Sequence, residues 1–457
     1  MKCFLWAVLG IAGLLCAAGR AETPERKGYF PLPPLKDPGA AGVGVQRTMT
    51  LLATSTPQHR NKVRVLFYGQ SITEQDWWKR VADDLRKRFP DADLEIENRA
   101  IGGFASQWLI RPAEHDLYPF YPDLVIFHVY GAHTTYEDII RSVRTRTTAE
   151  VLMQKDHVTA WPPQKPDEKA DKGLWWDHMM NHVFLPEFAK KYGGALLDVR
   201  GAWLEYLRAN TLEPKDLLKD GVHLNDHGNY LLAEIVKRYL VHRPDLPADA
   251  WRDRVRTLEV GKDVQWKGGK LVLEFEGNRV DAIAAKAGAK KAAEVRIDGK
   301  KPSEFPECYR ITRPSPGPWS PMFVSRVDHE KPLVLEDWTL KVTSVRPDGK
   351  TFTFEVKGSA TGEDGGGESA KPFVSKSGRV KIAPDAWFVP NKVTAGYQSQ
   401  WKVLPMFVDT YTAPETLDPS REAAVTLAQG LANTKHTLEL TGEAPIRAIR
   451  IYRPPVK

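Results

Sequence analysis

The feature that most constrains the fold is an alternation of short apolar runs and helical patterns between residues 61 and 245. Each run is dense in Val, Ile, Leu or Phe, which is typical of parallel strands buried on both faces. Such strand–helix alternation predicts a three-layer α/β domain. The predicted strands are 63–68, 94–97, 124–129, 151–154 and 195–199, and the predicted helices are 76–88, 138–145, 175–191, 203–209 and 227–240.

The residue pattern of the sequence changes after Pro247. Strand-like alternation dominates there, and dipeptides such as Asp298-Gly299 mark turns between the runs. We expect residues 246–457 to form a β-sandwich of the jelly-roll kind. Residues 363–368 contain three consecutive glycines and are predicted to be a flexible loop. They lack the Gly-Lys-Ser/Thr ending of a phosphate-binding loop, which argues against nucleotide binding.

The first residues are typical of a signal peptide. Lys2 precedes an apolar run at 4–18 that is too short to span a bilayer comfortably, and Gly19 and Ala21 are small residues suited to cleavage after Ala21. A lipoprotein is disfavoured because bulky Leu15 precedes Cys16. No later segment is apolar enough to cross a membrane. The mature protein is therefore expected to be secreted or periplasmic.

Four segments follow from these patterns. They are a signal peptide at 1–21, a Pro-rich N-terminal arm with a short amphipathic piece at 22–60, the α/β domain at 61–245 and the β domain at 246–457.

Charge and cysteine content exclude several classes of protein. The formal net charge of +7 is spread over interleaved basic and acidic residues, which disfavours nucleic-acid binding. Once Cys3 and Cys16 leave with the signal peptide, Cys308 stands alone and no intramolecular disulfide can form. An exported chain without disulfides depends on its hydrophobic core. Cys308 lies in a strand-like region, and a catalytic role for it is disfavoured.

A serine stands at the end of the first predicted strand, in Tyr68-Gly69-Gln70-Ser71-Ile72-Thr73. There it would be presented at the carboxyl edge of the sheet, where α/β proteins hold their ligands. Its own N–H, at the start of a helix, can face a developing anion, and Gly69 would allow a tight turn. By itself, the position fits a helix-capping serine equally well.

A second cluster, Lys219-Asp220-Gly221-Val222-His223, precedes the last helix. Asp220 and His223 are three residues apart, so the carboxylate can hold the imidazole in one tautomer. The other ring nitrogen can then take a proton from Ser71. Together the two clusters favour a nucleophilic serine over a capping serine and an incidental histidine.

The order of these blocks resembles the SGNH hydrolase superfamily, also called GDSL hydrolases. Gly69-Gln70-Ser71-Ile72 is similar to its Gly-Asp-Ser block, 98–103 to its second block, 122–134 to its third, and 220–223 to its closing Asp-x-x-His. The resemblance covers about 61–245. It implies a flavodoxin-like domain with a five-stranded parallel sheet, Gly103 as a donor to the oxyanion, and ester hydrolysis without a cofactor or metal.

Two positions depart from the family pattern. Gln70 replaces the usual Asp before the serine, where a local structural change is expected, and it is a candidate for the oxyanion or substrate-binding site together with Gly103 and His133. His133 stands where the family has its oxyanion Asn, and Thr134 follows in place of Asp. An imidazole can also donate a hydrogen bond, so His133 is expected to contribute to the oxyanion site or to contact substrate. Loss of such a donor costs about 2.7–4 kcal/mol.

Other candidate groups carry weaker signals. Asp177, His178 and His182 have zinc-like spacing on a helix but lack a third ligand and a general base. His227 fits a packing role at the start of the last helix. A further alternative is glycoside cleavage by paired carboxylates, for which the candidates are Glu74, Glu137 and Asp138.

The chain contains 14 Trp, and seven of them fall in the α/β region. Each one alone fits the core, but together they favour a carbohydrate ligand. SGNH enzymes joined to such β domains are often polysaccharide O-deacetylases, so the resemblance implies an exported carbohydrate esterase. Two alternatives stay open: a non-catalytic glycan-binding protein on the same scaffold, and a glycosidase that uses carboxylates.

Overall fold

Five parallel strands form the central sheet of the computed structural model, which describes residues 29–163, 166–247, 251–288 and 291–457. The strands run in the order β2-β1-β3-β4-β5, and every neighbouring pair is parallel. This is the order of flavodoxin-like sheets, so the predicted fold of the α/β domain is confirmed. The strands are β1 Lys62–Gly69, β2 Asp93–Asn98, β3 Leu124–His128, β4 Glu150–Gln154 and β5 Ala195–Leu197.

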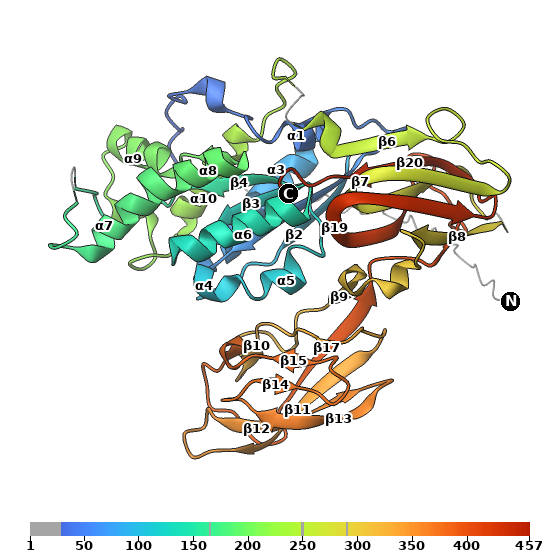
Figure 1. The fold of residues 1–457 in the computed structure, drawn as a ribbon. Helices are drawn as coiled ribbons and strands as arrows, with labels where there is room; N and C mark the ends of the chain where they lie inside the picture. Colours follow the sequence, from blue (N-terminus) through green and yellow to red (C-terminus); the bar gives the residue numbers. More distant parts are fainter. Residues whose placement is uncertain (1–28, 164–165, 248–250, 289–290) are drawn as a thin grey trace, which may run out of the picture. The chain divides into compact units, whose positions relative to one another are not determined.

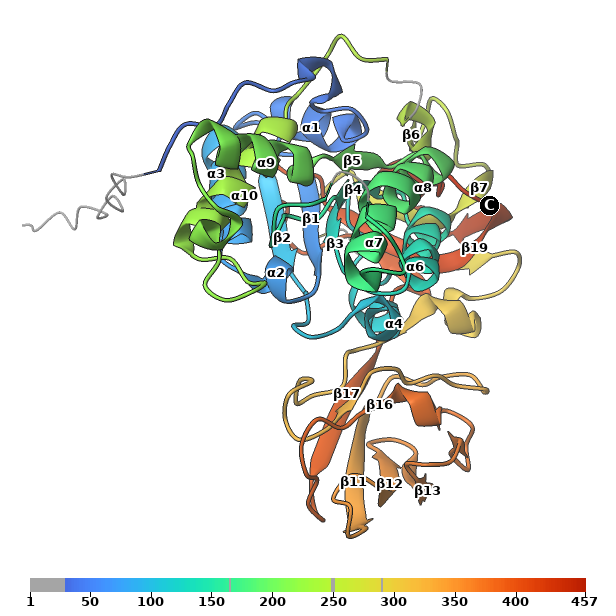
Figure 2. The same cartoon turned by 90° about the vertical axis from the view of Figure 1, so that its left-hand side faces the viewer.

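Helices cover both faces of this sheet (Figures 1 and 2). Side chains alternate across a strand, so Val65 and Phe67 of β1 join one buried cluster while Leu66 and Tyr68 join the other. The first cluster includes side chains of α1 Gln46–Ala53, α3 Trp77–Arg88, α9 Val199–Ala209 and α10 Asp226–Tyr239. The second includes side chains of α4 Ser106–Leu109, α5 Ala113–Asp116, α6 His133–Arg146 and α8 Leu185–Tyr192.

The helix predicted at 175–191 is divided in the structure. It consists of α7 Lys172–Met179, a π-helical turn Met180–Phe184 and then α8. Pro186 lies in the first turn of α8 and has no N–H for the ladder of the preceding turn. The proline therefore accounts for a change of hydrogen-bond pattern that apolar periodicity alone did not reveal.

The C-terminal half is mainly antiparallel, as predicted. Its larger sheet has six strands in the order β18-β8-β19-β7-β20-β6, with every described pair antiparallel. The inward side chains of these strands form a hydrophobic cluster of their own. The strands are β6 Val255–Glu259, β7 Lys270–Ala284, β8 Ala292–Ile297, β18 Thr410–Thr412, β19 Ala424–Thr441 and β20 Ile446–Tyr452.

A second antiparallel sheet has the order β13-β12-β11-β17-β9 and encloses a separate cluster around Trp338 and Trp401. Two short ladders, β10–β16 and β14–β15, add to it. The strands are β9 Tyr309–Ile311, β10 Phe323–Val324, β11 Asp337–Val345, β12 Phe352–Gly358, β13 Gly362–Glu368, β14 Phe373–Val374, β15 Lys381–Ile382, β16 Trp387–Phe388 and β17 Gln398–Pro405.

The prediction of a flexible loop at 363–368 is wrong, because these residues belong to edge strand β13, paired with β12. A Cβ on Gly366 would lie 2.4 Å from the carbonyl oxygen of Phe354, and one on Gly367 would lie 2.8 Å from the Phe373 ring. The glycines therefore allow close approach of neighbouring chain. The glycine content suggested a flexible segment, but glycine is needed here because neighbouring atoms leave no room for a side chain.

The second antiparallel sheet is joined to helix α5 by buried polar contacts. The His115 imidazole Nδ1 lies 3.0 Å from the carbonyl oxygen of Ile311, and the N–H of Val327 donates to His115 Nε2 at 3.2 Å. The Arg313 guanidinium donates to the Asp116 carboxylate at 2.7 Å. These contacts fix both ends of the segment 311–327, which carries Trp319.

Three predictions concern features outside the sheets. The signal peptide at 1–21 and its two cysteines lie outside the described residues. Cys308 is buried, and burial raises the pKa of its thiol to about 12, as suits an inert core position. None of the helices in the described part of the chain has the length and apolar character that a membrane crossing requires.

Candidate active site

The nucleophile candidate Ser71 opens the short helix α2 Ser71–Glu74, directly after β1. The strand can end there only with a glycine. A Cβ on Gly69 would lie 2.0 Å from the carbonyl oxygen of His128 on the neighbouring strand. Gly69 therefore serves close packing of β1 against β3, rather than the tight turn expected from the sequence.

Asp220 and His223 lie in the turn before α10. One Asp220 carboxylate oxygen accepts the N–H groups of Val222 and His223, at 2.8 and 2.7 Å. The other oxygen lies 2.9 Å from His223 Nδ1. The two backbone N–H groups and the imidazole hold the pKa of Asp220 well below its usual range. Asp220 is thus an anion that orients the ring.

The structure brings Ser71 to this pair. Its Oγ lies 3.0 Å from His223 Nε2, although the two residues are 152 positions apart in the chain. With Nδ1 donating to Asp220, the tautomer leaves Nε2 free to accept the hydroxyl proton. Hydroxyl, imidazole and carboxylate therefore form one continuous hydrogen-bonded chain, which is the arrangement that activates a serine.

The loop that carries Gly103 is tied to the serine loop. The Asn98 side chain donates to the carbonyl oxygen of Thr73 at 2.6 Å, and the N–H of Ile101 donates to that of Gly69 at 2.9 Å. Gly103 has a φ of +77°, which favours glycine. A Cβ there would meet the Trp319 indole at 2.7 Å, so Trp319 lies against this glycine.

The remaining two predicted site residues make other contacts. The His133 ring stacks on Phe184, with centroids 4.2 Å apart and planes 8° apart, and it also contacts Trp176. The backbone carbonyl oxygen of Gln70, whose side chain is buried, accepts the N–H groups of Thr73 and Glu74. Neither side chain hydrogen-bonds to Ser71. Their roles in the reaction therefore remain predictions.

Several residues around the turn were not identified from the sequence. His157 Nε2 lies 2.8 Å from the carbonyl oxygen of Val222, and Gln75 hydrogen-bonds both backbone groups of Leu224. Behind them, His128 Nε2 lies 2.6 Å from the buried Asp156 carboxylate. Their positions in the sequence could have identified them. His128 ends β3 and Asp156-His157 follow β4, and both strand ends lie at the same edge of the sheet as Ser71.

The weaker candidates do not assemble into alternative sites. Asp177 is paired with Arg200, and no group of three or more His, Cys, Asp or Glu in the described ranges is arranged to hold a metal ion. Glu137 contacts Lys191 and Tyr192, while Asp138 pairs with Arg141. His227 packs against Tyr206 at the start of α10, in line with the structural role expected for it.

The tryptophans divide into core and surface residues. Trp77 and Trp203 are fully buried, as expected for most of them. By contrast, Trp319 is 53% exposed and Trp161 is 39% exposed. The sequence singled out tryptophans of the α/β region, whereas the exposed indole beside Gly103 comes from the β region.

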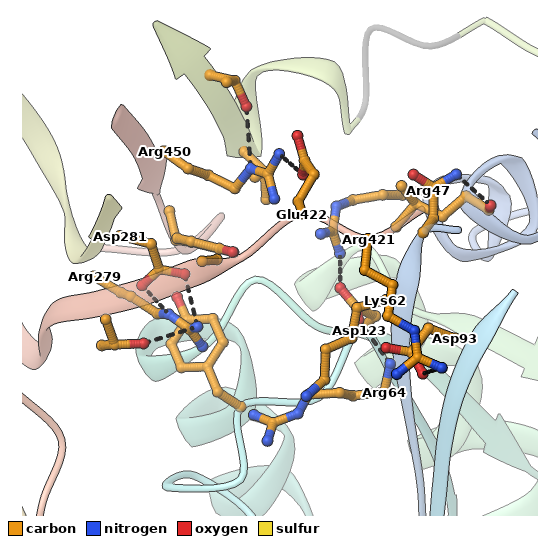
Figure 3. Close-up of a pocket in the computed structure, with 18 of the residues that line it drawn as sticks. Arg47, Lys62, Arg64, Asp93, Asp123, Arg279, Asp281, Arg421, Glu422 and Arg450 are labelled. Carbon is orange, nitrogen blue, oxygen red and sulfur yellow. Dashed lines mark hydrogen bonds and ion pairs between the residues drawn. The ribbon is translucent and has the colours of Figure 1, made fainter. Parts of the chain in front are cut away.

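A separate cavity of about 590 Å³ lies at the other edge of the sheet, near the start of β1 (Figure 3). We call it the amino-edge cavity. It is lined by eight basic and four acidic side chains. Arg47 pairs with Asp123 at 2.8 Å, and further pairs are Arg279–Asp281, Arg450–Glu422 and Arg421–Asp93. The length of β1 puts it about 26 Å from Ser71.

The fold is similar to that of esterases of known structure. A two-domain esterase active on acetylated mannans matches at 15% identity, over 92% of this chain and 97% of that chain, with a TM-score of 0.36. An acetylxylan esterase from Geobacillus stearothermophilus matches at 18% identity over 41% and 97%, with a TM-score of 0.35. These activities belong to those proteins.

A GDSL-like lipase from Parabacteroides merdae matches at 15% identity over 39% of this chain and 94% of that chain, with a TM-score of 0.32. No family model and no curated protein sequence matches the chain.

Proposed function

We propose that this protein is a serine esterase that removes O-acyl groups, most simply acetyl, from a polysaccharide outside the cytoplasm. One observation carries the proposal: Ser71 Oγ lies 3.0 Å from His223 Nε2, while His223 Nδ1 lies 2.9 Å from the Asp220 carboxylate. Export rests on the signal-like residues 1–21.

The proposed reaction is acyl transfer in two steps. Ser71 Oγ attacks the ester carbonyl carbon while His223 Nε2 takes the hydroxyl proton, and Asp220 stabilises the imidazolium. His223 then protonates the leaving sugar hydroxyl. A water molecule, deprotonated by His223, next attacks the acyl-enzyme. It releases the carboxylic acid and regenerates Ser71.

The oxyanion would be held by the N–H groups of Ser71 and Gly103. Both lie on loops at the carboxyl edge of the sheet, and the Asn98 side chain ties one loop to the other. His133 is the proposed third donor. Its ring packs face to face on Phe184, and this stacking does not use the ring nitrogens. A missing third donor would slow the enzyme by about 10²–10³.

A carbohydrate substrate is supported by the position of Trp319. Its indole lies against Gly103 and is more than half exposed. An exposed indole face beside the oxyanion glycine can receive the apolar face of a sugar ring. An acetyl group attached to that sugar would then reach Ser71.

The proposal is tested by hydrolysis of an aryl acetate, acetylated mannan and acetylated xylan. The wild-type protein should release acetate, and Ser71→Ala should lower kcat/KM by at least about 10⁴-fold because no other group can form the acyl-enzyme. Circular dichroism should show the same fold for both. Activity that persists in Ser71→Ala would refute the assigned nucleophile.

The alternative is a glycan-binding protein without activity. It is favoured by the substitution of His133 and Thr134 for the family's Asn and Asp, and by the stacking of His133 on Phe184. This alternative predicts equal affinity of the wild type and Ser71→Ala for acetylated oligosaccharides, with no acetate release by either.

A further inference from the structure

The turn that carries the imidazole is exposed. The side chains of Asp220 and His223 are 50% and 35% exposed, and Val222 between them is 43% exposed. A Cβ on Gly221 would have no neighbour within 4 Å. Apolar packing therefore does little to fix this turn, and other contacts must hold His223 at 3.0 Å from Ser71.

His157 makes one of these contacts. Its Nε2–H donates to the carbonyl oxygen of Val222 at 2.8 Å. The N–H of the same residue donates to the Asp220 carboxylate at 2.8 Å. The Val222 backbone is thus held from both sides, by His157 below and by Asp220 within the turn. The residue immediately before His223 cannot shift without breaking one of these two hydrogen bonds.

The His157 ring is itself fixed. It is 3% exposed, and it packs against the indole of Trp203 with ring centroids 5.5 Å apart. Burial and the nearby His128 lower the pKa of His157 to about 4, so the ring is neutral at pH 7. Donation from Nε2 leaves Nδ1 as the unprotonated nitrogen, which has no hydrogen-bond partner among the described residues.

Buried side chains hold Asp156, the residue before His157. The Asp156 carboxylate lies 2.6 Å from His128 Nε2 and accepts the Asn181 side-chain amide at 3.1 Å, while the N–H of Asp156 donates to the Asn181 amide oxygen at 2.7 Å. All three side chains are buried. The donor to Val222 therefore directly follows a residue that is fixed by several buried hydrogen bonds.

Gln75 makes the second contact, on the other side of His223. Its amide nitrogen donates to the carbonyl oxygen of Leu224 at 2.8 Å, and its amide oxygen accepts the N–H of Leu224 at 3.0 Å. This pairing resembles the exchange of hydrogen bonds between two peptide groups. Gln75 also ends the helix α2 that Ser71 begins. One short segment therefore carries the serine and holds the imidazole loop.

We propose that His157 and Gln75 are positioning residues that clamp the backbone before and after His223, so that its imidazole stays within proton-transfer distance of Ser71. The proposal rests on the proposed esterase function. A displacement of about 1 Å at a reacting group can cost about 10²-fold in rate. Loss of the clamp therefore lowers kcat and leaves substrate binding, and so KM, nearly unchanged.

The test compares His157→Leu with His157→Gln, and Gln75→Leu with Gln75→Glu. His157→Leu removes the donor and should lower kcat for an aryl acetate by about 10- to 100-fold, with KM within threefold. His157→Gln keeps an N–H donor at a similar distance and should recover most of the activity. Gln75→Glu keeps the acceptor for Leu224 but loses the donor, so its kcat should fall between wild type and Gln75→Leu.

His436→Leu is the matched control. His436 is also buried and also lies 2.8 Å from a backbone carbonyl oxygen, that of Ala432, but it belongs to β19. It should lose thermal stability and keep the wild-type kcat. If His157→Leu keeps the wild-type kcat, or if His157→Gln is as impaired as His157→Leu at equal Tm, the clamp is refuted.

A second measurement separates this proposal from the esterase function itself. The His223 Nδ1–H in its bond to Asp220 should give a downfield proton resonance, assigned by its loss in His223→Ala. The clamp predicts that this resonance broadens or disappears in His157→Leu and persists in His436→Leu, whether or not any ester is hydrolysed. An unchanged resonance in His157→Leu would overturn the proposal.

Discussion

The two edges of the parallel sheet use charged and polar side chains in opposite ways. At the amino edge, the carboxylates around the amino-edge cavity are held in ion pairs with arginines (Figure 3). At the carboxyl edge, the carboxylate of Asp220 is linked through His223 to the neutral hydroxyl of Ser71. In the proposed esterase, the chemistry lies at the carboxyl edge and not at the cavity rich in charge. What matters is a polar chain that ends on a group able to react.

Among the substitutions that distinguish the two edges of the sheet, Asp220→Asn is expected to have the largest effect. The amide cannot stabilise the imidazolium and can hold His223 in the wrong tautomer, so kcat should fall by roughly 10²- to 10⁴-fold. Tm should change little because the turn is exposed. Steady-state kinetics with an aryl acetate measure the loss, and Asp76→Asn, at the exposed N-cap of α3, is the control. A fall of less than threefold would contradict the role of Asp220.

At the amino edge, Asp123→Ala should cost stability instead of activity. Arg47 is 8% exposed at its side chain and would lose its carboxylate partner, while the N–H of Arg64 would lose its acceptor. An uncompensated buried charge costs about 3–5 kcal/mol. Urea unfolding should register this loss, and kcat below the transition should stay at the wild-type value.

Asp93→Ala is the matched control, because Asp93 and Arg421 are 29% and 42% exposed and 3.5 Å apart. Exposed pairs contribute about 0–1 kcal/mol. If Asp123→Ala lowers kcat of the folded protein tenfold, the two edges are coupled and the contrast between them fails.

A pH effect is expected from His115, which joins α5 to the segment carrying Trp319. Burial lowers the pKa of His115 to about 4, and the opposing effects of the hydrogen bond to Ile311 and of the Asp328 charge are smaller. Between pH 6.5 and 4 the unfolded chain binds a proton that the folded protein does not, so stability falls as pH falls through this window. The stabilisation that neutral His115 contributes is complete above about pH 6.5 and is about 2 kcal/mol smaller at pH 5.

Urea unfolding at pH 7 and pH 5 measures the contribution of His115 to the free energy of unfolding. His115→Gln should lose about 2 kcal/mol of the pH dependence, and the part due to the similarly buried His157 should remain. Equal pH slopes for the wild type and His115→Gln would show that His115 does not remain neutral in the folded protein.

The smallest expected effect is on substrate affinity. Trp319→Ala should raise KM for an acetylated polysaccharide about tenfold, equivalent to about 1.4 kcal/mol, because the stacking surface is lost. The kcat for an aryl acetate, which carries no sugar, should stay within twofold and serves as the internal control. Equal KM values for the polymer would remove the argument for a sugar at this position.

Sequence reasoning succeeded where information is local. Buried parallel strands are dense apolar runs, so all five were predicted, and the spacing of Asp220 and His223 sets their contact within one turn. Pairing with Ser71 was inferred because parallel strands present their carboxyl ends at one edge.

The rest depends on contacts that no local pattern encodes. His157 meets Val222 from 65 residues away, and Gln75 meets Leu224 from 149. Trp319 lies against Gly103, and contacts between residues far apart in the chain join its segment to α5. The glycines of β13 suggested a loop because composition does not say whether a glycine is needed for flexibility or for close approach.

The most direct test of the central claim is labelling with a fluorophosphonate. Ser71 Oγ should attack the phosphorus and displace fluoride while His223 takes the proton. Peptide mapping should then find one adduct, on Ser71, absent in Ser71→Ala and formed far more slowly in His223→Ala. No adduct in the wild type, an adduct on another residue, or an unchanged labelling rate in His223→Ala would contradict the assignment.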